Sequence, residues 1–311
     1  MNEREIVCPD LGRKIDELRN EGFRLDVIYP ADDPHTALLS RGRDLLRITT
    51  RPDALAIADA LPAFTPEFLI GRADAVSAEG RAGMKYRDLI PGRLGGRYVA
   101  SEILLDDGGP VADWVHFHRV ALQAIYVAEG WVRVVYEDQG EPFVMEAGDM
   151  VLQPPEIRHR VLESSPGLKV IEITSPALHE TFADHEMELP NRLGTGRLFR
   201  GQRFLRHVAA NTRWTRSSRG EAQETALVEA SGGLAQLRTI RAIGCEPIAF
   251  EAHDGELVFG FVLEGSAKLD RMGLSQIGAG DSFVIPPGEA WRIVEPSERF
   301  RMLHFTTARL D

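Results

Sequence analysis

The sequence predicts a mainly β protein with two tandem barrels behind a small N-terminal α+β extension. Two observations support this class. From Met84 onward, short runs of β-branched and aromatic residues alternate with glycine turns at intervals of about ten residues, which is typical of barrels and sandwiches. The spacing of glycine, histidine and proline in the first half also recurs in the second half, which indicates an internal repeat.

Residues 1–80 are expected to form the α+β extension. Apolar side chains recur at helical spacing over residues 12–22, and Gly22 is a suitable C-terminal stop. Residues 23–29 and 37–49 have the composition of strands, and a segment rich in proline and aspartate separates them. A helix and a hairpin bury too little to stand alone, so we expect this extension to pack on the barrel that follows.

The remaining chain is expected to divide into a first barrel over residues 81–175, a linker over 176–196 and a second barrel over 197–311. The linker is rich in proline and glycine and has an acidic middle, as connecting segments often do. His179 and His185 fall in this linker and are expected to be exposed to solvent.

Fixed intervals establish the repeat. Gly109 precedes His118 by nine residues, and Gly244 precedes His253 by nine. In both halves a Gly-Asp turn is followed by a Pro-Pro pair that begins six residues after the glycine. Coincidence across so many intervals is implausible, so the two halves are interpreted as copies of one β-barrel unit.

Three histidines of the first copy form a plausible metal site. His116 and His118 stand two apart in a strand-like stretch, so both side chains point to the same face. His159 comes from a distant segment after the Gly-Asp turn and the Pro-Pro pair. With Gln123 as a fourth, weaker ligand, these residues are the predicted metal site.

The second copy has lost most of these ligands. By spacing, Glu251 stands opposite His116, Val258 opposite Gln123, and Trp291 opposite His159. Only His253 keeps the ligand type of its counterpart. One imidazole with one carboxylate would bind a divalent ion weakly, so this barrel is expected to be metal-free, with an interior that could hold an organic ligand.

At these residues the chain resembles the cupin superfamily, whose first motif is G(X)5HXH(X)3–4E(X)6G and whose second is G(X)5PXG(X)2H(X)3N. The resemblance covers about residues 85–311 as a bicupin with a degenerate C-terminal copy. It implies the double-stranded β-helix, or jelly-roll, fold for both barrels. The matching positions are His116, His118, Gly130, Gly148, Pro154 and His159.

Departures from the motifs are visible. Six residues separate Gly109 from His116, Glu156 replaces the glycine of the second motif, and Gln123 replaces the glutamate ligand. The protein therefore offers three neutral imidazoles and at most a weak amide oxygen. We expect such a centre to leave the charge of a divalent ion uncompensated and so to attract an anionic, bidentate substrate.

A three-histidine centre in a bicupin is similar to gentisate and salicylate-type ring-cleaving dioxygenases. The resemblance implies one divalent metal in the first barrel, with Fe(II) favoured and Zn, Ni or Mn as alternatives. It implies a chelating organic anion, such as a hydroxylated aromatic acid, as substrate and O2 as co-substrate. The interpretation is that of a non-heme metal dioxygenase, an oxidoreductase.

Three residues are expected to take part beside the metal. Gln123 could coordinate the ion or donate a hydrogen bond to the substrate. Strand parity places Trp114 on the face of His116 and His118, as an aromatic wall. Arg97, near the start of the first barrel, could pair with a substrate carboxylate, although a plain surface salt bridge is the favoured interpretation.

Two other classes of function stay open. A metal-dependent isomerase, lyase or decarboxylase needs a general base near the metal, and the lost motif glutamate counts against it. A non-catalytic, small-molecule-binding bicupin would be favoured by a closed site or a full ligand shell. A carboxylate within reach of the open coordination positions could serve as this base and would favour the isomerase, lyase or decarboxylase class.

Composition limits the partners. The net charge of −11 argues against nucleic acid, which is bound by clustered positive charge. No segment approaches the roughly 18 consecutive apolar residues of a membrane helix, and the N-terminus lacks a signal-peptide pattern. Cys8 and Cys245 form no CxxC pair. A cytoplasmic protein is expected, with self-association through its sheet edges.

Overall fold

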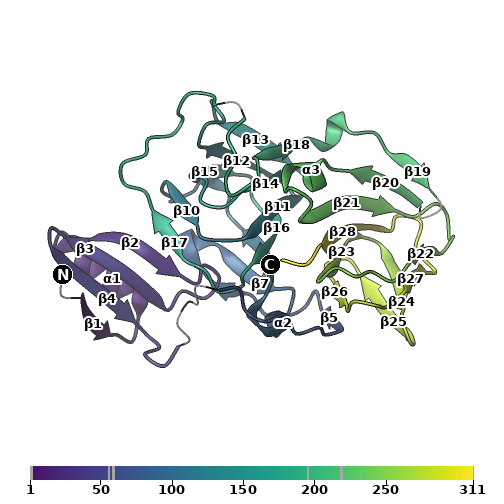
Figure 1. Ribbon diagram of the computed structural model, residues 1–311, viewed down its shortest axis with the longest axis horizontal. Helices are drawn as coiled ribbons and strands as arrows, with labels where there is room; N and C mark the ends of the chain where they lie inside the picture. The colour runs from purple at the N-terminus through teal and green to yellow at the C-terminus, as the bar shows by residue number, and fades with distance from the viewer. Residues whose placement is uncertain (1–2, 55–56, 58–59, 195, 218–219, 311) are drawn as a thin grey trace.

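The fold is seen in a computed structural model, which describes residues 3–54, 57, 60–194, 196–217 and 220–310. An N-terminal unit, a first barrel and a second barrel follow one another along the longest axis of the molecule (Figure 1). The predicted mainly β class with two barrels is confirmed. Among the described residues, no helix is both long and apolar enough to span a membrane.

The N-terminal unit packs one helix on a small sheet. Asp10 caps the helix by accepting a hydrogen bond from the backbone N–H of Arg13 at 2.9 Å. The predicted strand 37–49 is in fact two strands, because Gly42 turns the chain with a φ of 60°. The elements are β1 Glu3–Val7, α1 Leu11–Asn20, β2 Arg24–Tyr29, β3 Thr36–Arg41 and β4 Asp44–Thr49.

The first barrel is made from two facing sheets with strands of alternating burial. One sheet is continuous with the N-terminal unit, because β17 of the linker pairs with both β2 and β10. The barrel and its flanks contain β6 Ala78–Glu79, η1 Arg81–Gly83, β7 Lys85–Asp88, α2 Arg93–Gly96, β8 Val99–Leu105, β9 Gly109–Pro110, β10 His116–His118, β11 Leu122–Glu129, β12 Trp131–Tyr136, β13 Phe143–Glu146, β14 Met150–Leu152, β15 His159–Ser164, β16 Leu168–Ser175 and β17 Thr181–Ala183.

The second barrel repeats this arrangement with a seven-stranded and a four-stranded sheet. Each central strand has a counterpart in the first barrel, so β21, β23 and β28 correspond to β8, β11 and β16. Its elements are β19 Thr215–Ser217, β20 Gly220–Glu224, α3 Leu227–Ala230, β21 Ala235–Arg241, β22 Ile248–Phe250, β23 Val258–Glu264, β24 Ser266–Asp270, β25 Leu274–Gly278, β26 Ser282–Ile285, β27 Trp291–Val294 and β28 Arg301–Thr307.

Two short strands cross between the barrels. β5 Leu69–Gly71 precedes the first barrel in sequence but pairs with β26 of the second. β18 Leu205–His207 follows the first barrel, before η2 Ala209–Asn211, and pairs with β14 of the first. The edge strand β18 of the first barrel therefore comes from a later part of the chain. The edge strand β5 of the second barrel comes from a part of the chain that precedes the first barrel.

The largest apolar core lies between the barrels rather than inside either one. Leu122 and Ile173 of the first barrel pack in the same cluster as Leu237 and Phe305 of the second, and all four are at most 1% exposed. Because one face of each central sheet is used for this contact, the other face of each is left to line a barrel interior. The candidate site lies on that inner face of the first barrel.

Candidate metal centre

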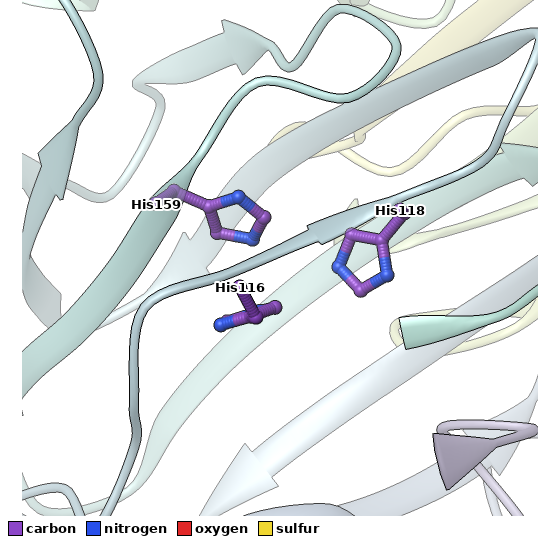
Figure 2. A group of neighbouring side chains, drawn as sticks. All are labelled: His116, His118 and His159. Carbon is purple, nitrogen blue, oxygen red and sulfur yellow. The ribbon is translucent and has the colours of Figure 1, made fainter. Parts of the chain in front are cut away.

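The three predicted histidines come together on two neighbouring strands. His116 and His118 lie two apart on β10, and His116 is the direct antiparallel partner of His159 at the start of β15. Figure 2 shows the three rings turned toward a common point. One ring nitrogen from each histidine lies within 4.8 Å of those of the other two, a spacing that could hold one metal ion.

Hydrogen bonds to the backbone orient two of these rings. Nδ1 of His116 lies 2.7 Å from the carbonyl oxygen of Trp114, and Nδ1 of His159 lies 3.0 Å from that of Ile157. A carbonyl only accepts, so both Nδ1 atoms carry the proton and both Nε2 atoms keep a lone pair. Metal-binding histidines are commonly held in this way. The donor set therefore fits a divalent ion.

Burial keeps the three imidazoles neutral, the form that a metal binds. It lowers the pKa of His159 to about 4. It also lowers the pKa of His116 and of His118 well below the ordinary range, and the charge of Arg81 acts in the same direction on both. At neutral pH no proton has to leave these rings before a metal binds.

The histidines border a cavity of about 90 Å³ inside the barrel. Its walls are mainly aliphatic, with Ile125 of β11 among them, as strand parity predicts. Five polar or charged side chains besides the histidines interrupt this apolar lining. They are Arg81, Tyr86, Tyr136, Gln153 and Glu172.

Arg81 brings a buried positive charge to the cavity. Its side chain is 9% exposed and forms an ion pair with Asp113, whose carboxylate is fully buried. Its Nη2 donates to Nε2 of His116 at 3.0 Å. Its Nε is buried and has no hydrogen-bond partner in the described part of the chain. One N–H of this guanidinium is thus left without a hydrogen bond.

The hairpin between β6 and β7 directs Arg81 inward. Gly80 lies so close to Tyr86 that an added Cβ would be 2.4 Å from its ring. Ala82 and Gly83 both have positive φ, of 57° and 74°, which turns the chain sharply after Arg81. Arg81 was not among the predicted site residues, because it follows directly on the extension expected over residues 1–80; the glycines at 80 and 83 mark a tight turn at this place.

A hydrogen-bond relay connects the other polar groups. The hydroxyl of Tyr136 donates to Oε1 of Gln153 at 2.9 Å, and Nε2 of Gln153 donates to Oε1 of Gln123 at 2.6 Å. Gln123 in turn bonds the carboxyl of Glu172. Gln123 does not line the cavity itself but links two residues that do. Its coordination of a metal stays a prediction.

Glu172 is the acidic group of the cavity. Burial raises its pKa to about 7, although hydrogen bonds from Gln123 and Thr174 oppose the shift. Glu172 lies on β16, where Val170, Glu172 and Thr174 share one face by alternation. A lone carboxyl on the inner face of an otherwise apolar strand was the sequence signal for this residue, and the sequence analysis did not use it.

Two predicted catalytic residues lie elsewhere. Arg97 forms a buried ion pair with Glu256 at 2.8 Å, so its predicted pairing with a substrate carboxylate in the metal cavity is wrong. It precedes β8 and reaches toward the second barrel. Trp114 precedes β10, so strand parity did not apply to it. It lines a groove against α1 and touches His116 from outside the cavity.

The two linker histidines differ from each other. His185 is exposed, as predicted, and its Nε2 donates to the carbonyl oxygen of Leu25 at 2.9 Å. His179 is buried at 4% exposure, so the prediction that it is solvent-exposed is wrong. Its ring meets His118 edge-on with centroids 5.5 Å apart. The cause is β17, which returns the linker to the barrel and brings His179 with it.

Fold and site together define a tandem-barrel protein, and the candidate metal centre found among its described residues lies in the first barrel. Residues 103–173, which form most of the first barrel, match the family model for the cupin domain. The resemblance inferred from the two motifs is thereby confirmed. Among curated proteins, none matches the sequence significantly.

Solved structures with the same fold are distant in sequence. Salicylate 1,2-dioxygenase from Pseudaminobacter salicylatoxidans is 16% identical with a TM-score of 0.55, and the match covers 79% of this chain and 86% of that one. Oxalate decarboxylase from Lactobacillus farciminis is 13% identical with a TM-score of 0.56, covering 82% and 88%. Protein Ylba from E. coli is 11% identical with a TM-score of 0.55, covering 81% and 95%.

Proposed function

We propose that this bicupin is a metal-dependent enzyme, a non-heme Fe(II) dioxygenase that acts on a small chelating organic anion. The observation that carries the proposal is the donor set: three neutral imidazoles with no carboxylate among the three clustered ligands. Fe(II) held by His116, His118 and His159 would supply open coordination positions for a bidentate substrate and O2.

The charges of the cavity support an anionic substrate. Neutral ligands leave the two positive charges of the ion uncompensated, and Arg81 adds a third beside His116. Its unpartnered Nε is suited to donate to a substrate carboxylate. In this proposal Arg81 takes the role that the sequence analysis gave to Arg97.

The size of the cavity favours a compact substrate. Its volume of about 90 Å³ is below the roughly 150 Å³ that accommodates benzene in an engineered protein cavity. An aromatic acid would therefore need the side chain of Arg81 or Met84 to move. Small 2-oxo and 2-hydroxy acids fit the same requirement for chelation without that movement.

A second candidate is a lyase, isomerase or decarboxylase, and Glu172 favours it. This carboxyl lines the same cavity as the histidines, and its pKa of about 7 lets it hold or release a proton near neutral pH. The relay from Tyr136 through Gln153 and Gln123 fixes its position. In that reaction class Glu172 would transfer protons and O2 would not be consumed.

The test combines metal analysis with activity assays in air and under anaerobic conditions. Protein from iron-replete cells is analysed for metal, loaded with Fe(II), and incubated with salicylate, gentisate and a series of small 2-oxo and 2-hydroxy acids, in air and anaerobically. The dioxygenase predicts stoichiometric iron, oxygen uptake with at least one acid, and loss of both on His159→Ala. His185→Ala, an exposed linker histidine, is the matched control.

The outcome separates the two candidates. Substrate loss that is equal with and without O2, and that disappears in Glu172→Gln, would assign the second class instead. Protein that takes up no iron and consumes no oxygen with any chelating acid would end the dioxygenase proposal.

A further inference from the structure

The second barrel has a cavity of about 210 Å³ at the place equivalent to the metal cavity. Trp291 starts β27 as His159 starts β15, and it is 2% exposed. The sequence spacing placed Glu251 opposite His116, but in the sheet Phe250 is the direct partner of Trp291, as His116 is of His159. An aromatic pair therefore stands where two metal ligands stand in the first barrel.

The register of the strands shows that the acidic residue of the first cavity has a counterpart of different charge type in the second cavity. Gln123 pairs with Thr174, and its counterpart Val258 pairs with Thr306. Two residues before these threonines lie Glu172 in the first barrel and His304 in the second. The acidic group of the first cavity is thus replaced by an imidazole.

The neighbouring strand adds a positive charge. His304 pairs directly with Arg238 on β21, whereas Glu172 pairs with the neutral Ser101 on β8. Both His304 and Arg238 line the cavity of the second barrel. The first barrel has an acidic residue, Glu172, at the position where the second barrel has two basic residues, His304 and Arg238. This difference indicates that the two cavities bind different ligands.

Arg238 is oriented for a ligand. Its Nε donates to Nδ1 of His304 at 3.3 Å, and its Nη1 meets the half-exposed Glu224 at 3.5 Å, a long contact. Its Nη2 has no hydrogen-bond partner among the residues that the structure describes. Gln236 and Thr306 line the same cavity and sit on the same faces of β21 and β28 as Arg238 and His304.

The aromatic wall favours a planar ligand. The rings of Phe250 and Trp291 are stacked with centroids 3.9 Å apart and planes 4° from parallel, and His304 lies within 26° of both. The cavity volume exceeds the roughly 150 Å³ that accommodates benzene. A ring can therefore enter, with its edge or face against this wall.

We propose that the second barrel is a metal-independent binding site for a small aromatic carboxylate, with Arg238 bound to the carboxylate and the ring against Phe250 and Trp291. The charged guanidinium can donate to the carboxylate through Nη2, because its Nε and Nη1 already contact His304 and Glu224. The side chains of Gln236 and Thr306 at the same cavity add further donors. Glu251 lines the cavity and Glu224 lies beside it, and both residues are exposed to solvent. The site does not depend on the function proposed for the first barrel.

Benzoate and its neutral analogue benzamide are the probes. Titration calorimetry on the chelator-treated, full-length protein is expected to show saturable binding of one benzoate per chain. Benzoate should bind at least about tenfold more tightly than benzamide, since hydrogen bonds to charged groups contribute about 1.5–3 kcal/mol and 1.4 kcal/mol corresponds to tenfold. Arg238→Gln should abolish this preference, and Arg238→Lys, which keeps the charge, should retain most of it.

Three further variants locate the binding and guard against misfolding. Arg241→Gln changes an exposed arginine on the same strand, paired with Glu221, and should leave benzoate binding unchanged. His159→Ala alters only the first barrel and should also leave it unchanged. All variants are compared by thermal unfolding, and the Arg238→Lys result tests the proposal if Arg238→Gln does not fold. The proposal is overturned if benzoate does not bind saturably, if Arg238→Gln keeps the preference, or if His159→Ala removes it.

Discussion

The guanidinium Nη2 of Arg81 lies 3.0 Å from Nε2 of His116, the nitrogen whose lone pair faces the metal site. One lone pair cannot accept this hydrogen bond and coordinate an ion at the same time. Arg81 is also positively charged and is held in place by the buried carboxylate of Asp113. Metal and arginine therefore compete for His116, both through the lone pair and through charge.

Removing this competitor should strengthen metal binding. For Arg81→Gln we expect divalent metal affinity to rise at least about tenfold, because two like charges about 4 Å apart repel by about 4 kcal/mol near a protein surface. Competition with a chromogenic chelator measures it. Lys85→Gln, on the same hairpin but exposed, is the control. Unchanged or weaker metal binding in Arg81→Gln would show that the arginine does not compete.

The metal-free protein should lose stability as the pH falls below about 6.5. Burial lowers the pKa of His159 to about 4, against about 6.5 in an unfolded chain. Between these two pH values the unfolded chain binds more protons than the folded protein does. The free energy of unfolding therefore decreases as the pH decreases, by up to about 3 kcal/mol for this residue. His116 and His118 shift in the same direction.

Urea unfolding at pH 7.5, 6 and 5 after chelation measures this loss. It is best done in Glu172→Gln, because the raised pKa of Glu172 acts in the opposite direction. His159→Leu should have a shallower pH dependence than its parent. A free energy of unfolding that does not change between pH 7.5 and 5 would contradict the burial of neutral histidines.

Glu172→Gln should stabilise the protein at alkaline pH. The folded-state pKa of Glu172 is about 7, above the value near 4.3 of an unfolded chain, so folding disfavours its charged form. This cost is absent below about pH 4.3 and is complete above about pH 7. We expect the variant to gain up to about 3.5 kcal/mol over wild type at pH 8 and about 1 kcal/mol at pH 5, by urea unfolding. An equal effect at both pH values would mean that Glu172 is not held in its neutral form.

Arg97 should matter for stability and not for metal binding. Arg97→Gln leaves the buried Glu256 without its partner, a change that costs about 3–5 kcal/mol. The double variant Arg97→Met with Glu256→Leu should recover much of that loss. Arg292→Gln removes an exposed pair with Asp270 and should cost less than about 1 kcal/mol. A change in metal affinity on Arg97→Gln would instead return this residue to the site.

The sequence predicted the parts of the site that depend on short intervals. His116 and His118 share a face because they lie on one strand, and the interval from the Gly-Asp turn and the Pro-Pro pair identified His159. Arg81 and Glu172 come from the preceding hairpin and from a third strand, outside both motifs. Arg81 and Glu172 come close to the histidines only because the two sheets fold over each other. The spacing of residues along the chain does not describe how the sheets pack.

The errors have local causes. Strand parity was applied to Trp114, which lies before β10 begins. Interval spacing placed Glu251 opposite His116, although Phe250 is the residue that pairs in the sheet. His179 was assigned to solvent because it lies in a polar linker, whereas β17 pairs that segment with β10. In each case a strand boundary decided the direction of a side chain.

The exchange of β5 and β18 sets where this chain could be cut. A division within residues 184–204 would deprive the N-terminal piece of β18 and the C-terminal piece of β5. Each piece would then expose unpaired backbone groups along β14 or β26, a template for aggregation. Neither barrel is thus a transferable module on its own. Because β17 also pairs with β2, the smallest unit that keeps all these sheets complete runs from β1 through β28, and domain recombination has to carry both barrels with the N-terminal unit.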